Sequence, residues 1–508
     1  MTMVTADAGP ALIGIDVGTS SVKAVMVDQT GVLLDRFSGA HAMQRPESGA
    51  AEQDPYGWLD LVDAALARLA THSHANSVAA IGITSQVNTH VFCDGARNPL
   101  ANAITWQDTR PGNDAAMLDA AISLEAKVGA LGAPIPIDAS HALSRMAWMA
   151  RKNPDIWANT GYVLSPKDFV IAHLTDETVA DPLASIGLVG TDLRYSDAVL
   201  ELLPGSDKLL PGLRDPLDIA GRVKEHRPFA GVPVAVGTMD AWAAMFGLGV
   251  AQDYQAMYLS GTSEVLGLIS PSRMGTPGVI TFPDWRGITL HAAPTQAGGA
   301  SIVWLSKLLG RNIADLSAFA AATSINAVSP LFLPHLEGER APLWDPTSRG
   351  GFAGLTSSSG PEEMAASVME GVAFSARLAL EAVGASGNHT IGTLRHGGGG
   401  AASDVWCQIR ANALGRPLER VKVAEAGATG ALAMASVACG LSADLADATS
   451  GLIAIDRTFE PETTAIALAD DRFAAYQDLY QGLRPIAEQL ARRPEQIVQT
   501  MTKESATR

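Results

Sequence analysis

Apolar stretches separated by glycine-containing turns recur along the chain, and the first pair predicts a β-hairpin. Residues 12–17 and 22–27 are both apolar and of strand length. Gly18-Thr19-Ser20 lies between them, and tight turns favour these residue types. The next apolar pattern has helical spacing over residues 55–70. Further strands are expected at residues 79–84 and 90–93, so the first half alternates strands and helices like an α/β domain.

The second half begins in the same way. Residues 232–236 predict a buried strand that ends in Gly237-Thr238-Met239-Asp240, and a helix rich in small residues is expected at 241–248. A strand at 255–259 then leads into Gly261-Thr262-Ser263, which repeats the first turn. Helices are expected at 361–383, 404–414 and 429–439. The pattern predicts a flexible N-terminus (1–10), an N-terminal domain (11–248), a C-terminal domain (249–485) and a helix end with a tail (486–508).

Composition fits this two-domain interpretation and narrows the function. The 508 residues are 47% hydrophobic and 18% charged, which is enough to bury two substantial cores. The net charge of −17 argues against binding to nucleic acid. The most apolar of the long stretches, residues 232–250, contains Asp240 and several glycines, so no membrane span is expected. Three cysteines without paired spacing indicate neither disulfides nor a zinc site and favour the cytoplasm.

The repeated turn is a candidate phosphate-binding feature. Successive backbone N–H groups in a glycine turn form a concave nest for phosphate oxygens, and Thr or Ser hydroxyls add donors. Gly18, Thr19 and Ser20 could form one nest and Gly261, Thr262 and Ser263 another. The alternative is that each triplet is only a hairpin turn.

Two aspartates accompany these turns. Asp16 interrupts an apolar strand, where a carboxylate is costly unless it is paired or binds a metal, and Mg²⁺ suits a carboxylate beside a phosphate nest. A strand-end aspartate bonded to backbone is the alternative. Asp240 lies between a strand and a helix and could accept a proton from a substrate hydroxyl. Its alternative role is to cap that helix.

Four consecutive glycines, residues 397–400, precede Ser403 and a helix. Glycines allow close approach to the backbone, and a nucleoside would suit such a segment. A flexible loop is the alternative. The spacing does not match a dinucleotide-binding G-x-G-x-x-G motif, and no acidic partner is evident at the end of a following strand.

Taken together and in order, these segments resemble the FGGY family of carbohydrate kinases over about residues 11–485, with a pattern most similar to xylulokinases. Further landmarks of the resemblance are AEQDPYGW (51–58), ITWQDTRP (104–111), SPKDFV (165–170), VGTMDAW (236–242), FLPHLEGERAPLWDP (332–346), RGGFAGL (349–355) and GGGGAASDVWCQIRANALGRPLE (397–419). The resemblance implies an α/β, two-domain, actin-like (ribonuclease-H-like) ATPase fold with the active site in the cleft between the domains.

The resemblance also implies roles. Asp240 matches the catalytic base that takes the proton of a sugar hydroxyl as it attacks the γ-phosphate of ATP, and Asp16 matches the carboxylate that organises Mg²⁺ through water. The ATP-binding residues implied are Gly18, Thr19, Ser20, Gly261, Thr262, Ser263, Gly299, Gly398, Gly399 and Ser403. The sugar-side residues implied are Gln86, Val87, Asn88, Trp106 and Asp108, together with Asp240. Relatives also suggest a homodimer.

The substrate is the open question. Xylulokinases usually carry Gly-Gln-Met-His-Gly after the strand that here ends in Ser85-Gln86-Val87-Asn88, and glycerol kinases carry Asn-Gln-Arg-Glu-Thr. The overall resemblance to xylulokinases makes a pentulose such as D-xylulose the first expectation. Because neither set of substrate contacts is kept, glycerol, erythritol, ribulose and gluconate are the alternatives. His90 is either a displaced substrate contact or a structural residue. Glu264, after the second turn, replaces a residue that is commonly small in xylulokinases.

A rival of another class is an actin- or Hsp70-like protein that uses nucleotide to drive interactions. Such a protein would need the phosphate turns, but neither the Trp106–Asp108 segment nor a base at Asp240. These features favour an enzyme, a phosphotransferase with an alcohol group as acceptor.

Overall fold

The computed structural model describes residues 9–423 and 425–491, and this chain forms two compact α/β units. Unit 1 consists of the chain up to Asp253, Ile280–Leu290 and Lys422–Ala454. Unit 2 consists of Tyr254–Val279, His291–Val421 and the chain from Ile455 onward. The units are therefore not two contiguous segments, because Lys422–Ala454 returns to unit 1 from within the expected C-terminal domain.

A six-stranded sheet forms the centre of unit 1, in the order β11-β12-β5-β1-β2-β3. Its strands are β1 (Ala11–Val17), β2 (Ser21–Asp28), β3 (Leu33–Ala40), β5 (Val78–Ser85), β11 (Ile219–Arg222) and β12 (Pro233–Ala235). β1 and β2 pair antiparallel, which confirms the predicted hairpin, and β5 runs parallel to β1. The C-terminal ends of β1 and β5, at Val17 and Ser85, therefore lie at the same edge of the sheet.

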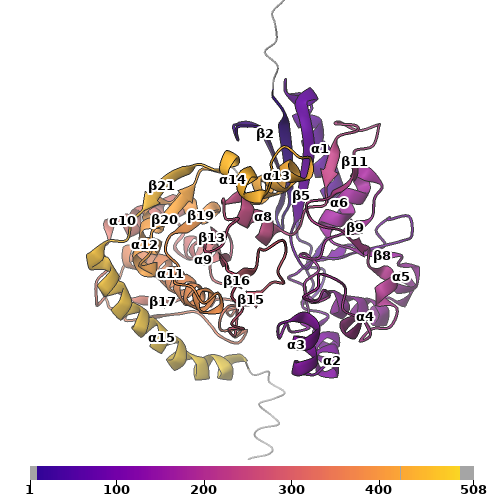
Figure 1. Ribbon diagram of the computed structural model, residues 1–508. Helices are drawn as coiled ribbons and strands as arrows, with labels where there is room; N and C mark the ends of the chain where they lie inside the picture. The colour runs from indigo at the N-terminus through magenta and orange to yellow at the C-terminus, as the bar shows by residue number, and fades with distance from the viewer. Residues whose placement is uncertain (1–8, 424, 492–508) are drawn as a thin grey trace, which may run out of the picture. The chain divides into compact units, whose positions relative to one another are not determined.

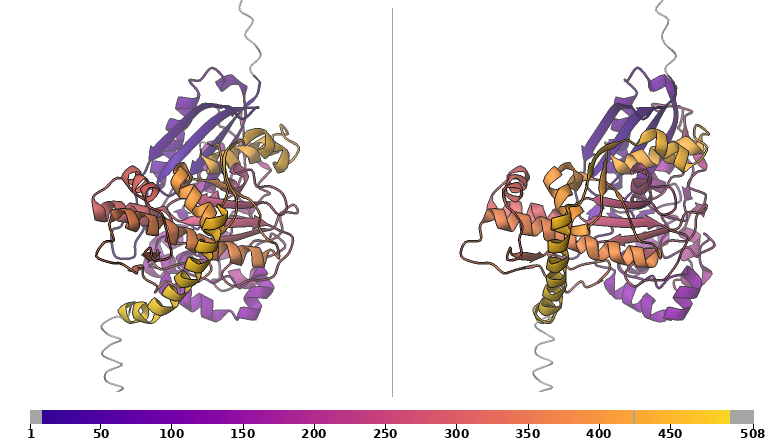
Figure 2. Two further views of the ribbon diagram at one scale, coloured as in Figure 1. Left: turned by 90° about the vertical axis from the view of Figure 1, so that its left-hand side faces the viewer. Right: turned by 60° about the vertical axis from the view of Figure 1, so that its left-hand side comes forward.

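Helices cover both faces of this sheet. The alternating side chains Ile13, Ile15 and Val17 pack with α1 (Pro55–Leu69) and α6 (Pro166–Thr175) in one core. Leu12, on the other face, packs against α13 (Ala426–Ala438). α13 also lies along α8 (Asp240–Gly247). A helix from late in the chain therefore covers this face of the sheet (Figures 1 and 2). This packing explains why Lys422–Ala454 belongs to unit 1.

The approach of α13 to its neighbours is close enough to require glycine. A Cβ atom at Gly14 of β1 or at Gly82 of β5 would lie 1.9 Å from a carbonyl oxygen of α13. On α13 itself, a Cβ at Gly430 would lie 1.6 Å from the carbonyl oxygen of Ala243 in α8. Any side chain at these contacts would push backbone away from backbone.

The rest of unit 1 is a helical region with its own core, which contains Phe92, Leu143, Met146 and Val163. Its elements are β6 (Val91–Cys93), α2 (Gly112–Ala121), α3 (Leu124–Leu131), α4 (Ala142–Lys152), α5 (Pro154–Asn159), β8 (Tyr162–Leu164) and α7 (Asp197–Leu200). Short strand pairs join it to the chain around it: β4 (Glu52–Gln53) with β7 (Ala103–Ile104), and β9 (Val179–Ala180) with β10 (Gly212–Leu213).

Unit 2 contributes six neighbouring strands to a second sheet, in the order β16-β14-β13-β19-β20-β21. They are β13 (Ala256–Ser260), β14 (Glu264–Ile269), β16 (Leu290–Pro294), β19 (Leu394–Gly397), β20 (Leu418–Val421) and β21 (Ile455–Phe459). The other main elements are α9 (Gly299–Leu309), α10 (Ile313–Ala322), β17 (Leu331–Leu333), β18 (Gly351–Ala353), α11 (Pro361–Ser386), α12 (Asp404–Leu414) and α15 (Thr463–Ala491). The long helix α15 packs with α11 and α12 (Figure 1).

Most predicted elements are confirmed, and the differences lie at their ends. α12 has the predicted bounds, whereas α11 continues to Ser386 and α13 begins at Ala426. α8 begins at Asp240, one residue earlier than expected, and the extended residue before it is Met239, with a ψ of 164°. No helix among residues 9–423 and 425–491 is long and apolar enough to cross a membrane.

The glycine contact makes a testable prediction. Gly430→Ala should lower the free energy of unfolding by roughly 2 kcal/mol or more, because the new methyl group overlaps the Ala243 carbonyl and outweighs the gain of about 1 kcal/mol in helix propensity. The matched control is Gly129→Ala in α3, where a Cβ meets nothing within 4 Å and the variant should be slightly stabilised. Thermal unfolding of both variants measures the difference. Equal stability of Gly430→Ala and the parent would contradict the close approach.

Candidate active site

The first predicted phosphate turn connects β1 to β2 and is tied to the neighbouring strand. The backbone N–H of Gly18 donates to the Ser21 carbonyl at 3.1 Å, which closes the turn. The N–H of Gln86 donates to the Val17 carbonyl at 3.0 Å, so the residue after β5 is held beside the end of β1. The predicted turn and one predicted sugar-side residue are therefore neighbours.

Thr19 links this turn to further sugar-side residues. The indole Nε1 of Trp106 donates to Thr19 Oγ1 at 3.1 Å, and Gln53 Nε2 donates to the Thr19 carbonyl at 2.6 Å. Gln86 Nε2 donates to Gln53 Oε1 at 2.8 Å. The turn, Trp106 and Gln86 thus form one hydrogen-bonded group. Gln53 lies in the AEQDPYGW landmark, but its place in the site could not be inferred from the residues around it.

Asp108 has a different environment from Trp106. Its side chain is buried, and both carboxylate oxygens accept from Arg110, with Nη2 lying 2.7 Å from Oδ2. Oδ2 also accepts from the backbone N–H of Ala51 at 2.9 Å. These contacts hold the 51–53 segment against the 105–110 segment. A direct contact between Asp108 and a sugar therefore stays a prediction.

Asn88 and its neighbours form the other predicted part of the sugar side. Asn88 has a positive φ of 48°, and its Nδ2 donates to Ser140 Oγ at 3.1 Å. The guanidinium of Arg145, on α4, is buried; it donates to the Asn88 carbonyl and, at 2.5 Å, to the Thr105 carbonyl. Val87, between Gln86 and Asn88, is partly buried. Arg145 therefore fixes both sugar-side segments, a role that nothing in the local sequence indicated.

The contact with Arg145 indicates which of the two roles considered for His90 the structure favours. Arg145 Nη1 lies 2.8 Å from His90 Nδ1, and burial together with this cation lowers the pKa of His90 well below its ordinary value. Burial also lowers the pKa of Arg145 to about 9. A neutral imidazole that accepts a hydrogen bond from Arg145 favours the structural alternative for His90.

Asp16 and Asp240 lie close enough in unit 1 to influence each other's charge. Asp16 is the penultimate residue of β1, and its Oδ1 is buried without a hydrogen-bond partner among the residues that the structure describes. Burial and the negative charge of Asp240 raise the pKa of Asp16 to about 7, against a smaller opposing effect of Lys23. Asp240 is the first residue of α8, and its Oδ1 accepts from the backbone N–H of Ala241 at 2.8 Å. Near neutral pH, this pair therefore favours a bound cation or proton.

Unit 2 builds its own turn between β13 and β14. The N–H of Gly261 donates to the Ser263 carbonyl at 2.9 Å. The start of α9 packs onto this turn, because Gly299 and Ala300 donate to the carbonyls of Gly261 and Thr262 at 2.9 and 3.0 Å. The structure thus brings together two of the segments that were predicted to bind nucleotide.

The glycine run reaches the same place. Gly398 has a φ of 90°, and a Cβ there would lie 2.3 Å from the carbonyl of Ser260, at the end of β13. Gly399 begins a 3₁₀ turn (Gly399–Ala402), and Ser403 caps α12 by accepting from the Trp406 N–H at 3.3 Å. The run is therefore a structured turn beside the 261–263 turn.

A buried ion pair joins these parts of unit 2. Glu264 and Arg410 are both fully buried, and Arg410 Nη2 lies 2.7 Å from Glu264 Oε1. The Tyr258 hydroxyl donates to Glu264 Oε2 at 2.6 Å, and Arg410 Nη1 donates to the Gly400 carbonyl at 2.8 Å. The pair thus links the start of β14 to the glycine run. Glu264 was visible as an unusual residue, but its partner lies too far along the chain to be inferred.

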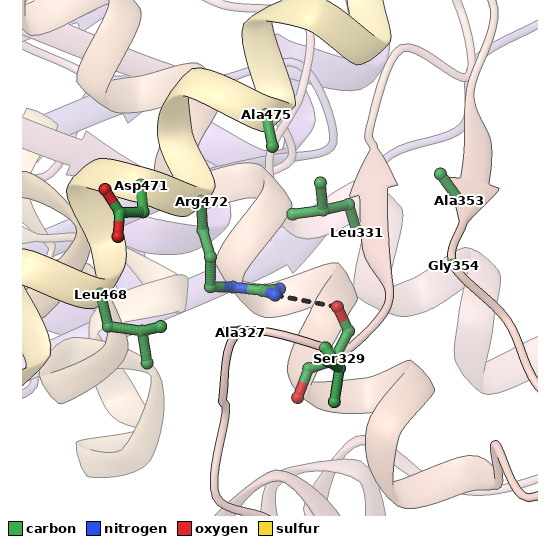
Figure 3. Close-up of a pocket in the computed structure, with 10 residues that line it drawn as sticks. Ala327, Ser329, Leu331, Ala353, Gly354, Leu468, Asp471, Arg472 and Ala475 are labelled. Carbon is green, nitrogen blue, oxygen red and sulfur yellow. Dashed lines mark hydrogen bonds between the residues drawn. The ribbon is translucent and has the colours of Figure 1, made fainter.

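A cavity of about 300 Å³ lies elsewhere in unit 2, between α15 and the β17–β18 strands (Figure 3). None of the predicted site residues lines it. Arg472, on its wall, donates to the carboxylate of Glu370 and to the Ser329 carbonyl at 2.8 Å. Because the guanidinium of Arg472 is already engaged by protein oxygens, it does not make this cavity a phosphate-binding site.

Comparisons with known proteins agree with this arrangement. Residues 11–247 match the N-terminal domain of the FGGY family of carbohydrate kinases, and residues 256–439 match its C-terminal domain. The xylulose kinase of Escherichia coli (strain K12) is 29% identical over 487 residues, which cover 93% of this chain and 99% of that protein.

Solved structures give the same result. A xyloylose kinase from Brucella ovis has a TM-score of 0.83 and 28% identity, covering 94% of this chain and 100% of that one. A gluconate kinase from Lactobacillus acidophilus has a TM-score of 0.86 at 23% identity, covering 95% and 100%. These similarities confirm the predicted two-domain, actin-like α/β fold. Because the two family domains together match most of its length, the chain belongs to the FGGY family of carbohydrate kinases.

Proposed function

We propose that this protein transfers the γ-phosphoryl group of ATP to a hydroxyl of a small sugar, with D-xylulose as the first choice. One observation carries the proposal: Thr19 joins the first phosphate turn to Trp106 and, through Gln53, to Gln86. A nucleotide-driven interaction protein needs the turn but has no use for sugar-side residues attached to it. Membership of a carbohydrate kinase family and the similarity to xylulose kinases support the choice.

Asp240 is the proposed base. As the sugar oxygen attacks the γ-phosphorus, the hydroxyl proton passes to the Asp240 carboxylate, and the bond between the phosphorus and the oxygen of ADP breaks. The position suits this task, because the carboxylate lies at the first residue of α8 with its Oδ1 fixed by the Ala241 N–H. Catalysis of this reaction depends mainly on positioning and on neutralising charge.

Asp16 is the proposed residue for Mg²⁺. Its buried Oδ1 has no partner among the described residues, and a Cβ at Gly427 would lie 2.5 Å from its Oδ2, so the surroundings leave room only for small groups. The described part of the chain holds no cluster of three His, Cys, Asp or Glu residues arranged for a metal. Mg²⁺ needs only one or two carboxylates when waters and phosphates complete its shell, so Asp16 fits. When bound, the ion would neutralise phosphate charge.

The remaining assignments complete the proposal. In unit 1, Gly18, Thr19 and Ser20 bind ATP phosphates. In unit 2, the ATP-binding residues are Gly261, Thr262, Ser263, Gly299, Gly398, Gly399 and Ser403. Val87, Asn88 and Asp108 belong to the sugar side. A homodimer and a cytoplasmic location stay predictions.

The substrate is tested by coupled measurement of ADP release with D-xylulose, D- and L-ribulose, glycerol, erythritol, xylitol and gluconate. We expect kcat/KM for D-xylulose to exceed that of every other compound by at least about tenfold, because unpaired buried polar groups penalise the wrong polyol. A different preferred substrate would contradict the choice of D-xylulose but not the proposed sugar kinase activity. ATP turnover that is equally fast without any sugar would contradict the proposed kinase activity itself.

The environment of Asp16 predicts a pH-dependent effect on stability. With a pKa of about 7 when folded and 3.8 as its ordinary value, Asp16 costs stability increasingly as pH rises from about 4 to about 7. Asp16→Asn removes this cost, so the stability advantage of the variant over the parent should grow by about 2 to 3 kcal/mol between pH 5 and pH 8. Urea unfolding in EDTA measures this advantage, with Asp60→Asn on the exposed face of α1 as control. An advantage that is equal at both pH values would contradict the assignment.

A further inference from the structure

The SPKDFV segment carries a buried lysine for which the proposed reaction has no use. Lys167 lies in the first turn of α6, and its side chain is fully buried. Its Nζ lies 2.6 Å from Asp168 Oδ1 and 3.2 Å from Asp181 Oδ2. Although burial lowers the pKa of Lys167, the two carboxylates raise it by more, so the lysine is a cation. A buried charge persists only when it is paired, and here one cation serves two carboxylates.

Asp181 extends this cluster to the segment that precedes Asp240. Its Oδ1 accepts from the Thr238 hydroxyl at 2.7 Å and from the backbone N–H groups of Leu183 and Ala184 at 3.0 Å each. Asp181 and Thr238 are both fully buried. The lysine thus holds the aspartate in place, and the aspartate holds the residue two positions before the proposed base.

The same segment is anchored to β5 from the other side. Thr84 Oγ1 donates to the Thr238 carbonyl at 2.7 Å, and Met239 forms a parallel bridge with Ser85. The backbone N–H of Lys167 donates to Ser85 Oγ at 3.1 Å, so the lysine is also connected to the strand residue that pairs with Met239. Residues 238–239 are therefore fixed through a side chain, a carbonyl and a backbone bridge.

The geometry points to a positioning role: we infer that the Lys167–Asp181–Thr238 network orients the start of α8, so that the Asp240 carboxylate meets the substrate hydroxyl. Thr238 and Lys167 are positioning residues, since they act through Asp240. This inference rests on the proposed function of Asp240. A base must lie within hydrogen-bond reach of the proton that it takes, and a displacement of about 1 Å can cost about a hundredfold in rate.

Thr238→Val removes only the hydroxyl that donates to Asp181. It keeps the shape of the side chain and leaves Asp181 in contact with Lys167 and two backbone donors. We expect kcat with the best sugar to fall by about tenfold to a hundredfold, while KM for ATP stays within about twofold. Thr238→Ser restores the hydroxyl and should recover kcat to within about threefold of the parent.

The matched control is Thr160→Val, which removes a buried threonine hydroxyl that donates to the Ile156 carbonyl at 2.8 Å, outside the network. Its kcat should equal that of the parent. If Thr238→Val keeps the kcat of an active parent, or if Thr238→Ser is as slow as Thr238→Val, the network does not position the base. If the parent itself phosphorylates no sugar, the proposed function has failed instead.

Discussion

The close packing of α13 against β1, β5 and α8 is the contact on which the candidate site depends. Glycines at Gly14, Gly82 and Gly430 allow backbone to meet backbone there, and no larger residue fits without moving an element. Asp16 is the penultimate residue of one packed strand, and Asp240 begins the packed helix. The distance between the two carboxylates is thus set by the core of unit 1. Since burial and, after it, the negative charge of Asp240 raise the pKa of Asp16, the packing also sets the electrostatics of the site.

The two repeated turns have the same local form and different surroundings. In unit 1, Thr19 of the first turn accepts a hydrogen bond from Trp106, and Asp16 lies two residues before Gly18 of the turn. In unit 2, the start of α9 packs onto the second turn. β14 follows that turn, and the buried Glu264–Arg410 pair links β14 to the glycine run. One turn is therefore integrated with carboxylate and sugar-side groups, and the other with segments suited to a nucleotide. The asymmetry between the two copies lies in what each turn contacts.

The sequence predicted those features that depend on neighbouring residues. Apolar alternation and glycine turns located both hairpins, and helical spacing located α1 and α12. It could not show that α13 covers the sheet of unit 1, because that contact joins residues far apart in the chain, such as Gly14 and Ala428. Arg145 and Arg410 were missed for the same reason, since a buried arginine gains its role only from distant partners. Family resemblance supplied the role of Asp108, yet its carboxylate is engaged by Arg110.

The role of Asp240 is the central claim, and Asp240→Asn tests it most directly. The amide keeps the size of the side chain and can still accept from the Ala241 N–H, but it cannot take a proton. The account predicts that kcat for sugar phosphorylation falls by at least about a hundredfold, while calorimetry shows ATP affinity within about threefold of the parent. Retention of more than about a tenth of the parent kcat would contradict it.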